Sequence, residues 1–274
     1  MRLIHTIADL RAALAAHAGI TLVPTMGNLH DGHLSLVAKA RQRPGLVVAS
    51  IFVNPLQFGP QDDFAKYPRT LEHDCGLLAR GGCDIVFAPA AQEMYPDEQT
   101  CKVHPPAALA ETLEGIARPG FFVGVCTVVL KLFNIVQPHA AVFGKKDFQQ
   151  LLVIRNMVQQ FALAVEIVAA ETVRDADGLA LSSRNGYLNE RERAQAVQLS
   201  AVLRGIGGEV RAGHTDWQRL EQDAFSSLVQ HGWRPDYVAI RRREDLSAPL
   251  DARSLVVLAA ARLGGTRLID NLEI

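Results

Sequence analysis

The sequence reads Pro24-Thr25-Met26-Gly27-Asn28-Leu29-His30-Asp31-Gly32-His33 at the junction of a predicted strand and a predicted helix. Before this stretch, residues 20–23 form a short apolar run that is typical of a buried strand. After it, apolar side chains recur at helical spacing (Leu34, Val37, Ala38). The two glycines let the backbone approach a ligand closely, and the N–H groups at the start of a helix favour an anion. The stretch therefore predicts a phosphate-binding loop between a strand and a helix.

The two histidines of this loop allow more than one interpretation. His30 and His33 are close enough in sequence to face the same side of one helical turn. A strand, a glycine and a helix also form ordinary βα turns, in which such histidines are solvated, and both interpretations stay open at this point. A zinc site is not favoured, because metal-binding helices place two histidines four apart with a glutamate between them.

Composition indicates an ordinary globular protein with a small-molecule substrate. The chain has 274 residues, 49% apolar and 21% charged, enough for one large domain or two unequal ones. Its formal charge of −1 gives no electrostatic reason to expect a nucleic acid partner. Asp9 and Arg11 interrupt any apolar leader, and no apolar run approaches membrane-spanning length. The four cysteines form no C-x-x-C pair, so we expect reduced thiols and a cytoplasmic protein.

The first two-thirds of the chain alternates β-rich runs with helical patterns. We expect strands at 46–53, 84–88, 140–143 and 165–168, and helices at 12–18, 71–80, 125–136 and 147–161. Alternating strands and helices indicate crossover connections, so the fold class is α/β, with a Rossmann-like doubly wound parallel sheet. Ligands of such sheets collect beyond the carboxyl ends of the strands, where the strand order reverses.

The pattern changes after about residue 173. A polar turn at 174–178 precedes a helix that Asn189 is expected to cap, and short strands follow at 236–240, 255–260 and 267–270. We therefore expect a Rossmann-like domain over 1–172 and a smaller C-terminal α+β domain over 173–274. The Asp177-Gly178 turn suits a mobile lid. Basic residues 241–243 are followed at once by Glu244 and Asp245, which favours a solvated strand end over a phosphate patch.

Several polar side chains follow predicted strands and are candidates for the site. A neutral amide can orient a carboxylate and leave it nucleophilic, which suits Gln57 and Gln150, although Asn54-Pro55 before Gln57 is also a common turn. The Lys146 ammonium can reach phosphates, although an exposed surface lysine is the commoner explanation. Further along, two hydroxyls and a guanidinium suit a polyphosphate (Ser182, Ser183, Arg184).

The H-x-G-H pattern of His30 to His33 resembles the nucleotide signature of α/β nucleotidyl-transferring proteins related to class I aminoacyl-tRNA synthetases. With Pro24 to Gly27 in front of it, the resemblance narrows to the pantothenate synthetase (pantoate–β-alanine ligase) family. Matching motifs continue in the same order along nearly the whole chain: 50–55, 57–58, 67–70, 94–96, 113–115, 118–120, 131–133, 147–151, 177–185 and 268–271.

The resemblance implies particular ligands and site residues. It implies ATP with Mg²⁺, pantoate and β-alanine as ligands, and a homodimer. It implies His33 as the catalytic histidine, and Gln57 and Gln150 as pantoate-binding residues, with Gln57 also at the β-alanine position. The ATP site that it implies comprises Met26, Gly27, Asn28, Leu29, His30, Asp31, Gly32, His33, Gly144, Lys145, Lys146, Asp147, Val173, Leu181, Ser182, Ser183 and Arg184.

The activity implied by the resemblance has two steps. The carboxylate of pantoate attacks the α-phosphate of ATP and releases pyrophosphate, and the amine of β-alanine then attacks the acyl adenylate and releases AMP. Two positions depart from the family pattern, which usually has glutamate in place of Lys145 and histidine in place of Phe121. The side-chain role at position 145 is therefore in question, and no chemistry is assigned to Phe121.

Two other function classes stay open from the sequence. One is a nucleotidyltransferase of the same superfamily, which would join a nucleotide to a phosphorylated acceptor and ignore β-alanine. The other is a nucleotide-binding module without turnover.

Overall fold

The structure is a computed structural model that describes residues 1–59 and 64–274. It divides into two compact units. The first comprises Met1–Lys145 and Val153–Glu171, and the second comprises Lys146–Leu152 and Thr172–Ile274. The expected domain division between residues 172 and 173 stays a prediction, and the short segment from Lys146 to Leu152 belongs to the second unit.

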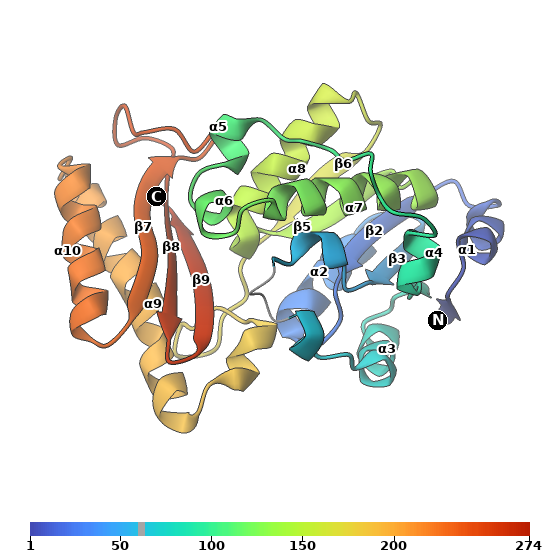
Figure 1. The fold of residues 1–274 in the computed structure, drawn as a ribbon, viewed down its shortest axis with the longest axis horizontal. Coiled ribbons are helices and arrows are strands. Elements are labelled where there is room, and N and C mark those ends of the chain that lie inside the picture. Colours follow the sequence, from blue (N-terminus) through green and yellow to red (C-terminus); the bar gives the residue numbers. More distant parts are fainter. Residues whose placement is uncertain (60–63) are drawn as a thin grey trace. The chain divides into compact units, whose positions relative to one another are not determined.

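The first unit is built on a parallel sheet, drawn from blue to yellow in Figure 1, with the strand order β1-β4-β3-β2-β5-β6. This confirms the predicted α/β class and the doubly wound sheet. The strands are β1 (Arg2–Ile4), β2 (Ile20–Thr25), β3 (Leu46–Ile51), β4 (Ile85–Phe87), β5 (Ala140–Gly144) and β6 (Glu166–Ala170).

Helices connect these strands. The α-helices are α1 (Ile7–Leu14), α2 (Asp31–Arg41), α3 (Leu71–Arg80), α4 (Ala91–Met94), α5 (Ala107–Ala110), α6 (Glu114–Ala117), α7 (Phe121–Val136) and α8 (Phe148–Gln160). Short 3-10 turns are η1 (Pro55–Gln57), η2 (Phe64–Lys66), η3 (Lys145–Asp147) and η4 (Ser183–Tyr187).

The sheet is buried on both faces. Val23, Ala49 and Val142 pack with α2 and α3 in one apolar cluster. Because side chains alternate between the faces of a strand, Leu22 and Val48 lie on the opposite face, and both are fully buried. A parallel sheet that is covered on both faces explains why these strands read as continuous apolar runs.

The strand order reverses at β2, which lies between β3 and β5. The loop that starts at Met26 follows β2, and Lys145 follows β5, so both leave the sheet at the carboxyl ends of neighbouring strands. The expectation that these two segments follow strands at the same edge of the sheet is confirmed.

Two predicted helices have different limits in the structure. The helix expected at 12–18 is instead α1, because Thr6 caps its start by accepting a hydrogen bond from the Asp9 N–H at 3.1 Å, and the helix ends before Ala15. The helix expected at 125–136 begins earlier, at Phe121, directly after Gly120, whose φ of +80° is a left-handed conformation that glycine adopts without strain.

The second unit is a small α+β structure, as predicted. Its antiparallel sheet, orange to red in Figure 1, has the order β7-β8-β9, with β7 (Arg234–Arg242), β8 (Leu255–Leu263) and β9 (Thr266–Glu273). Helices α9 (Glu190–Arg211) and α10 (Trp217–Gln230) pack on this sheet through a core that includes Leu203, Leu228 and Trp233. Asn189 caps α9 in a reciprocal capping box with Glu192, which confirms its predicted role.

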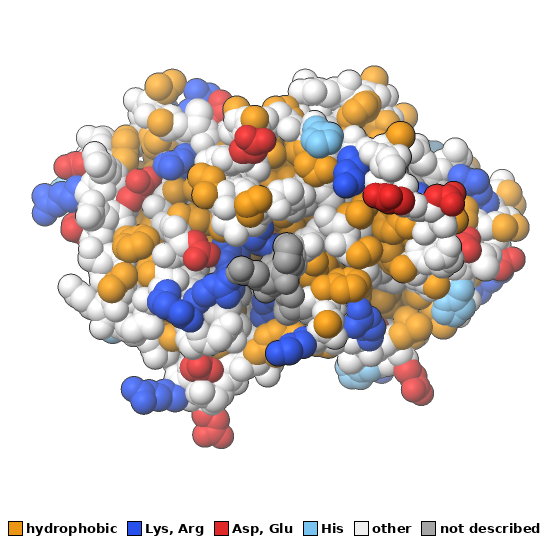
Figure 2. All heavy atoms as spheres, in the orientation of Figure 1, with side chains coloured by type: hydrophobic (Ala, Val, Ile, Leu, Met, Phe, Trp, Pro, Cys, Tyr) orange, Lys and Arg blue, Asp and Glu red, His pale blue; other side chains and the backbone are white. Residues whose placement is uncertain are grey.

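The surface agrees with the near-neutral composition. Both signs of charge are present on the face drawn in Figure 2. In the described part of the chain, no helix has the length and apolar character needed to cross a membrane.

Candidate functional site

The loop between β2 and α2 is held by a buried carboxylate. Asp74, on α3, is fully buried and accepts hydrogen bonds from the backbone N–H groups of Asn28 and Leu29, each at 2.9 Å. It also accepts the Thr70 hydroxyl at 3.0 Å. Both Gly27 and Asn28 have positive φ, +81° and +50°, so Asp74 stabilises a tight left-handed turn directly after the strand.

His30 and His33 cap the helix that follows this turn. The His30 Nδ1 accepts the Gly32 N–H at 3.1 Å, and the His33 Nδ1 accepts the His30 N–H at 3.3 Å. Because both Nδ1 atoms accept hydrogen bonds, the neutral rings carry their proton on Nε2. The ring centroids lie 4.1 Å apart, so the capping box holds the two imidazoles side by side.

Several backbone N–H groups of this loop donate hydrogen bonds within the protein. Besides the two that Asp74 accepts, the N–H of Gly27 donates to the Thr25 hydroxyl at 3.2 Å, and those of His30 and Gly32 donate to the imidazoles. These hydrogen bonds fix the backbone of the loop around the two imidazole rings.

Gln57 has a defined orientation beside the same loop. Its Oε1 accepts a hydrogen bond from the Asn54 Nδ2 at 3.1 Å, and its Nε2 lies 3.1 Å from the Met26 Sδ. Asn54 is 1% exposed and is itself fixed, because its Oδ1 accepts the Tyr95 hydroxyl at 2.8 Å and its Nδ2 also donates to the Gly124 carbonyl at 3.1 Å. The Gln57 amide thus directs its N–H donors towards the loop, where they suit a carboxylate or hydroxyl acceptor.

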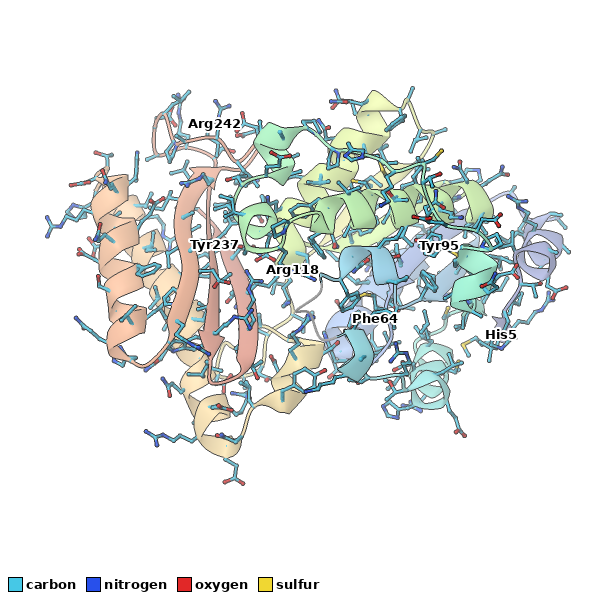
Figure 3. The ribbon with its side chains drawn as sticks, in the orientation of Figure 1. His5, Phe64, Tyr95, Arg118, Tyr237 and Arg242 are labelled. Carbon is cyan, nitrogen blue, oxygen red and sulfur yellow. The ribbon has the colours of Figure 1, made fainter. Side chains whose placement is uncertain are left out.

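Aromatic side chains support these amides. Burial raises the pKa of Tyr95, so its hydroxyl stays protonated and keeps donating to Asn54. Lys131 of α7 lies over the Tyr95 ring, which Figure 3 labels beside α4, at 4.8 Å from the centroid. Phe121 lies 3.9 Å from the guanidinium of Arg118, whose Nη2 donates to the Gln57 carbonyl at 3.2 Å. The departure from histidine at position 121 therefore places an apolar platform under Arg118.

The side chain of Lys145 is engaged next to the end of β5. Its Nζ forms an ion pair with Glu171 at 2.6 Å. The charge that lysine introduces in place of the usual glutamate is therefore balanced locally, within the first unit.

The second unit carries Lys146, Asp147 and Gln150 on its short segment. The carbonyl of Lys146 accepts a hydrogen bond from the Asn271 Nδ2 at 2.8 Å. Next to Asn271, the buried Asp270 receives two hydrogen bonds from Arg174, at 2.7 and 2.8 Å. Strand β9 therefore fixes the backbone from which the Lys146 side chain extends.

The turn at 174–178 is tied down in the second unit. Leu181 donates from its N–H to the Val173 carbonyl at 3.0 Å, so these two predicted nucleotide residues are backbone partners. Arg193 forms ion pairs with Asp175 and Asp177 at 2.8 and 2.7 Å, which lowers the pKa of Asp177. Ser182 then caps η4 by accepting the Arg184 N–H at 3.2 Å.

The remaining expectations concern metals, thiols and basic residues. Among the residues that the structure describes, no group of His, Cys, Asp or Glu side chains is arranged to hold a metal ion. The four cysteines are free thiols, as predicted. Each arginine at 241–243 is paired with an acidic side chain, and Arg242, labelled in Figure 3, lies at the end of β7, which confirms the predicted solvated strand end.

Asp74 is the functional candidate that the sequence prediction missed. It lies on α3 at the spacing of Leu71 and Leu78, which face the core. A carboxylate at a core-facing position of a helix needs buried hydrogen-bond donors, and this pattern was the signal available in the sequence. The identity of its donors, at positions 28 and 29, depends on the fold.

The sequence was also compared with models of known protein families. Residues 2–273 match the family model described as pantoate-beta-alanine ligase. The chain belongs to the pantoate-beta-alanine ligase family.

Individual relatives agree with the family match over the full length. The chain is 61% identical over 285 residues to the pantothenate synthetase of Leptothrix cholodnii, covering 100% of both chains. It is 58% identical to that of Thiobacillus denitrificans, covering 100% of this chain and 97% of the relative.

Solved structures of this family share the fold. The crystal structure of pantothenate synthetase from Thermus thermophilus matches with a TM-score of 0.95 at 46% identity, covering 100% of this chain and 99% of that one. The pantoate-beta-alanine ligase from Francisella tularensis, complexed with beta-gamma ATP and beta-alanine, matches with a TM-score of 0.86 at 32% identity, covering 100% and 97%.

Proposed function

We propose that this chain is an ATP-dependent ligase that condenses pantoate with β-alanine to form pantothenate. In the first step, a pantoate carboxylate oxygen attacks the α-phosphorus of ATP, pyrophosphate leaves, and a pantoyl adenylate forms. In the second step, the β-alanine amine attacks the acyl carbon, the bond to the AMP oxygen breaks, and the amine loses a proton. The family match over residues 2–273 supports this activity.

One observation in the structure carries the proposal. The Gln57 Nε2 lies 3.1 Å from the Met26 Sδ, so the amide expected to bind the acid is next to the loop expected to bind the nucleotide. Both groups belong to the first unit and follow neighbouring strands, β2 and β3. An acid held by Gln57 at this edge would have its carboxylate close to a nucleotide held by the loop, which is what an in-line attack requires.

The histidines supply positioned donors for the charge that develops on phosphate. The capping box fixes the His33 ring through Nδ1, and in this proposal the Nε2–H of that ring donates to phosphate. A donor fixed before the reaction stabilises a transition-state oxyanion without reorganisation. In this proposal His33 is the catalytic residue, and His30 contributes a second donor and the orientation of the ring. Neither ring needs to be positively charged, because a neutral imidazole with its proton on Nε2 can donate.

Further nucleotide-binding roles in this proposal rest on the family resemblance. Lys146 and Arg184 would balance phosphate charge, and Ser182 and Ser183 would donate hydroxyl hydrogen bonds. The support for these roles is the family resemblance, together with the hydrogen bond that anchors the Lys146 backbone to Asn271. Gln150, on the same segment as Lys146, is assigned to pantoate on the resemblance alone.

Magnesium enters this proposal with the substrate. Mg²⁺ is commonly bound by substrate phosphates and water with few protein ligands. A homodimer and a cytoplasmic location are further parts of the proposal that rest on the family alone.

One assay separates this function from the alternatives. The chain is incubated with ATP, Mg²⁺ and pantoate, and AMP release is followed with and without β-alanine. Stimulation by β-alanine, together with pantoate-dependent exchange of labelled pyrophosphate into ATP, is the expected result. A nucleotide-linked product that forms without β-alanine would indicate a nucleotidyltransferase, and ATP binding without turnover would indicate a binding module.

A further inference from the structure

We infer that Asp74 is a positioning residue for adenylate formation, acting through the loop that carries His30 and His33. The inference rests on the proposed function, because it assigns a role in the first of the two steps. Asp74 lies on α3, outside the loop itself, and is the only acidic side chain that is fully buried in the described residues.

The contacts of Asp74 are all directed at the loop or its support. Its Oδ1 accepts the Leu29 N–H and its Oδ2 accepts the Asn28 N–H, both at 2.9 Å, while the Thr70 hydroxyl donates to Oδ2. Charge-assisted hydrogen bonds of this kind are stronger than those between neutral groups. Two successive N–H groups on one carboxylate fix the direction in which the chain leaves Gly27.

The loop has little room to adopt another path. A Cβ at Gly27 would lie 3.0 Å from the Asp74 Oδ2 and 3.1 Å from the Ile51 side chain, so the carboxylate packs directly against the turn. Asn28 has a positive φ without being glycine, a conformation that needs support from its surroundings. Asp74 provides that support through the Asn28 N–H.

The position of the loop sets the position of the histidine donors. Leu29 precedes His30 directly, and the His30 backbone N–H is in turn the donor to the His33 Nδ1. A shift of the Asn28–Leu29 peptide would therefore move both halves of the capping box. Since catalysis by a fixed donor depends on its placement, an error of about 1 Å is enough to lower the rate by up to about 100-fold.

Asp74 also engages two backbone N–H groups of the loop that could otherwise bind an anion. The N–H groups of Asn28 and Leu29 donate to this carboxylate, so both are already engaged within the protein. A carboxylate behind the loop would repel phosphate if it were exposed, but its charge is balanced by three donors in the protein interior.

The decisive experiment compares Asp74→Asn with Asp84→Asn. Asn at position 74 keeps one acceptor oxygen, but its NH₂ group faces a backbone N–H that then has no acceptor. Asp84 is a matched control, because it also accepts a backbone N–H, from Val47 at 2.8 Å, but at the amino end of β4, away from the loop. Thermal unfolding of both variants measures the cost in stability.

The experiment compares the rate of pyrophosphate exchange, KM for ATP and KM for β-alanine in each variant. Asp74→Asn is expected to lower the rate of pantoate-dependent pyrophosphate exchange by about tenfold or more and to change KM for ATP, with KM for β-alanine nearly unchanged. Asp84→Asn is expected to lose stability with wild-type exchange rates. Thr70→Val, which removes only the hydroxyl donor, should fold and show a smaller change in the same direction.

The outcomes distinguish the inference from the function on which it rests. Wild-type exchange kinetics in a folded Asp74→Asn or Thr70→Val variant would overturn the positioning role and leave the ligase activity standing. If Asp74→Asn does not fold, the Thr70→Val variant alone decides the result. Absence of pantoate-dependent exchange in the unaltered chain would instead overturn the proposed function.

Discussion

The Asn271 side-chain amide donates a hydrogen bond to the backbone carbonyl of Lys146 at 2.8 Å, across 125 residues of sequence. Asn271 is 6% exposed, and Asp270 beside it is fixed by two hydrogen bonds from Arg174. Strand β9 therefore holds the backbone of Lys146, the residue that the proposed function assigns to the phosphates of ATP.

Removing the hydrogen bond between Asn271 and Lys146 should lower the activity measurably. Asn271→Ala removes a buried hydrogen bond worth about 1 kcal/mol, so kcat/KM for ATP should fall roughly fivefold. If Asn271 acts through the Lys146 side chain, the same substitution should cost much less in a Lys146→Ala background. Asn134→Ala, at an exposed position on α7, is the control and should behave as the unaltered chain. Full additivity of the two substitutions would show that Asn271 acts independently of the Lys146 side chain.

The proposed function gives His33 a catalytic role besides its capping contact, and two substitutions separate the two. His33→Ala removes both the Nδ1 acceptor of the capping box and the Nε2–H donor, and should cost about 2 kcal/mol or more in the barrier for adenylate formation. In His33→Asn, the amide oxygen occupies nearly the position of Nδ1 and can accept the His30 N–H, but no group replaces Nε2–H.

The second variant tests whether the Nε2–H group of His33 is the catalytic donor. His33→Asn should recover most of the thermal stability that His33→Ala loses, while its single-turnover rate of adenylate formation stays low. Recovery of the rate together with the stability would show that capping, and not the Nε2–H donor, is the contribution of His33.

Gln57 should determine affinity for the acid. In Gln57→Glu, one carboxylate oxygen still accepts the Asn54 Nδ2, but the N–H donor beside Met26 is replaced by negative charge. Repulsion of a carboxylate substrate should raise KM for pantoate by about tenfold or more. KM for ATP should change little, and steady-state kinetics with each substrate varied in turn measures both. An equal rise in both constants would contradict a specific role in acid binding.

Because two of its thiols are buried, the folded chain should lose stability at alkaline pH. Burial raises the pKa of Cys126 from its ordinary 9.0 to about 12 and that of Cys83 to about 11. Above pH 9 the unfolded chain releases these protons while the folded chain keeps them, so the stabilisation present below pH 9 is lost as pH rises. Between pH 9 and 11 each thiol should cost about 1.4 kcal/mol per pH unit. Urea unfolding of the chain and of Cys126→Ala, whose slope against pH should be smaller, checks this.

Much of the fold follows from local sequence patterns. The order of strands and helices from residue 20 to 170 and the capping of α9 by Asn189 agree with the prediction, because apolar spacing and capping residues act within a few positions of each other. Helix limits were less accurate where one residue decides them. Thr6 starts α1 early, and Gly120 in a left-handed conformation sets the start of α7.

The sequence by itself determined the element order, the strand, loop and helix around Gly27, and the family. Tertiary structure decided which groups of the site contact one another. The partners of Asp74 lie 45 and 46 residues away, Met26 lies 31 residues from Gln57, and Asn271 lies 125 from Lys146. Residue spacing within an element follows from backbone geometry, whereas the direction of a single imidazole or amide depends on partners that only the folded chain brings together.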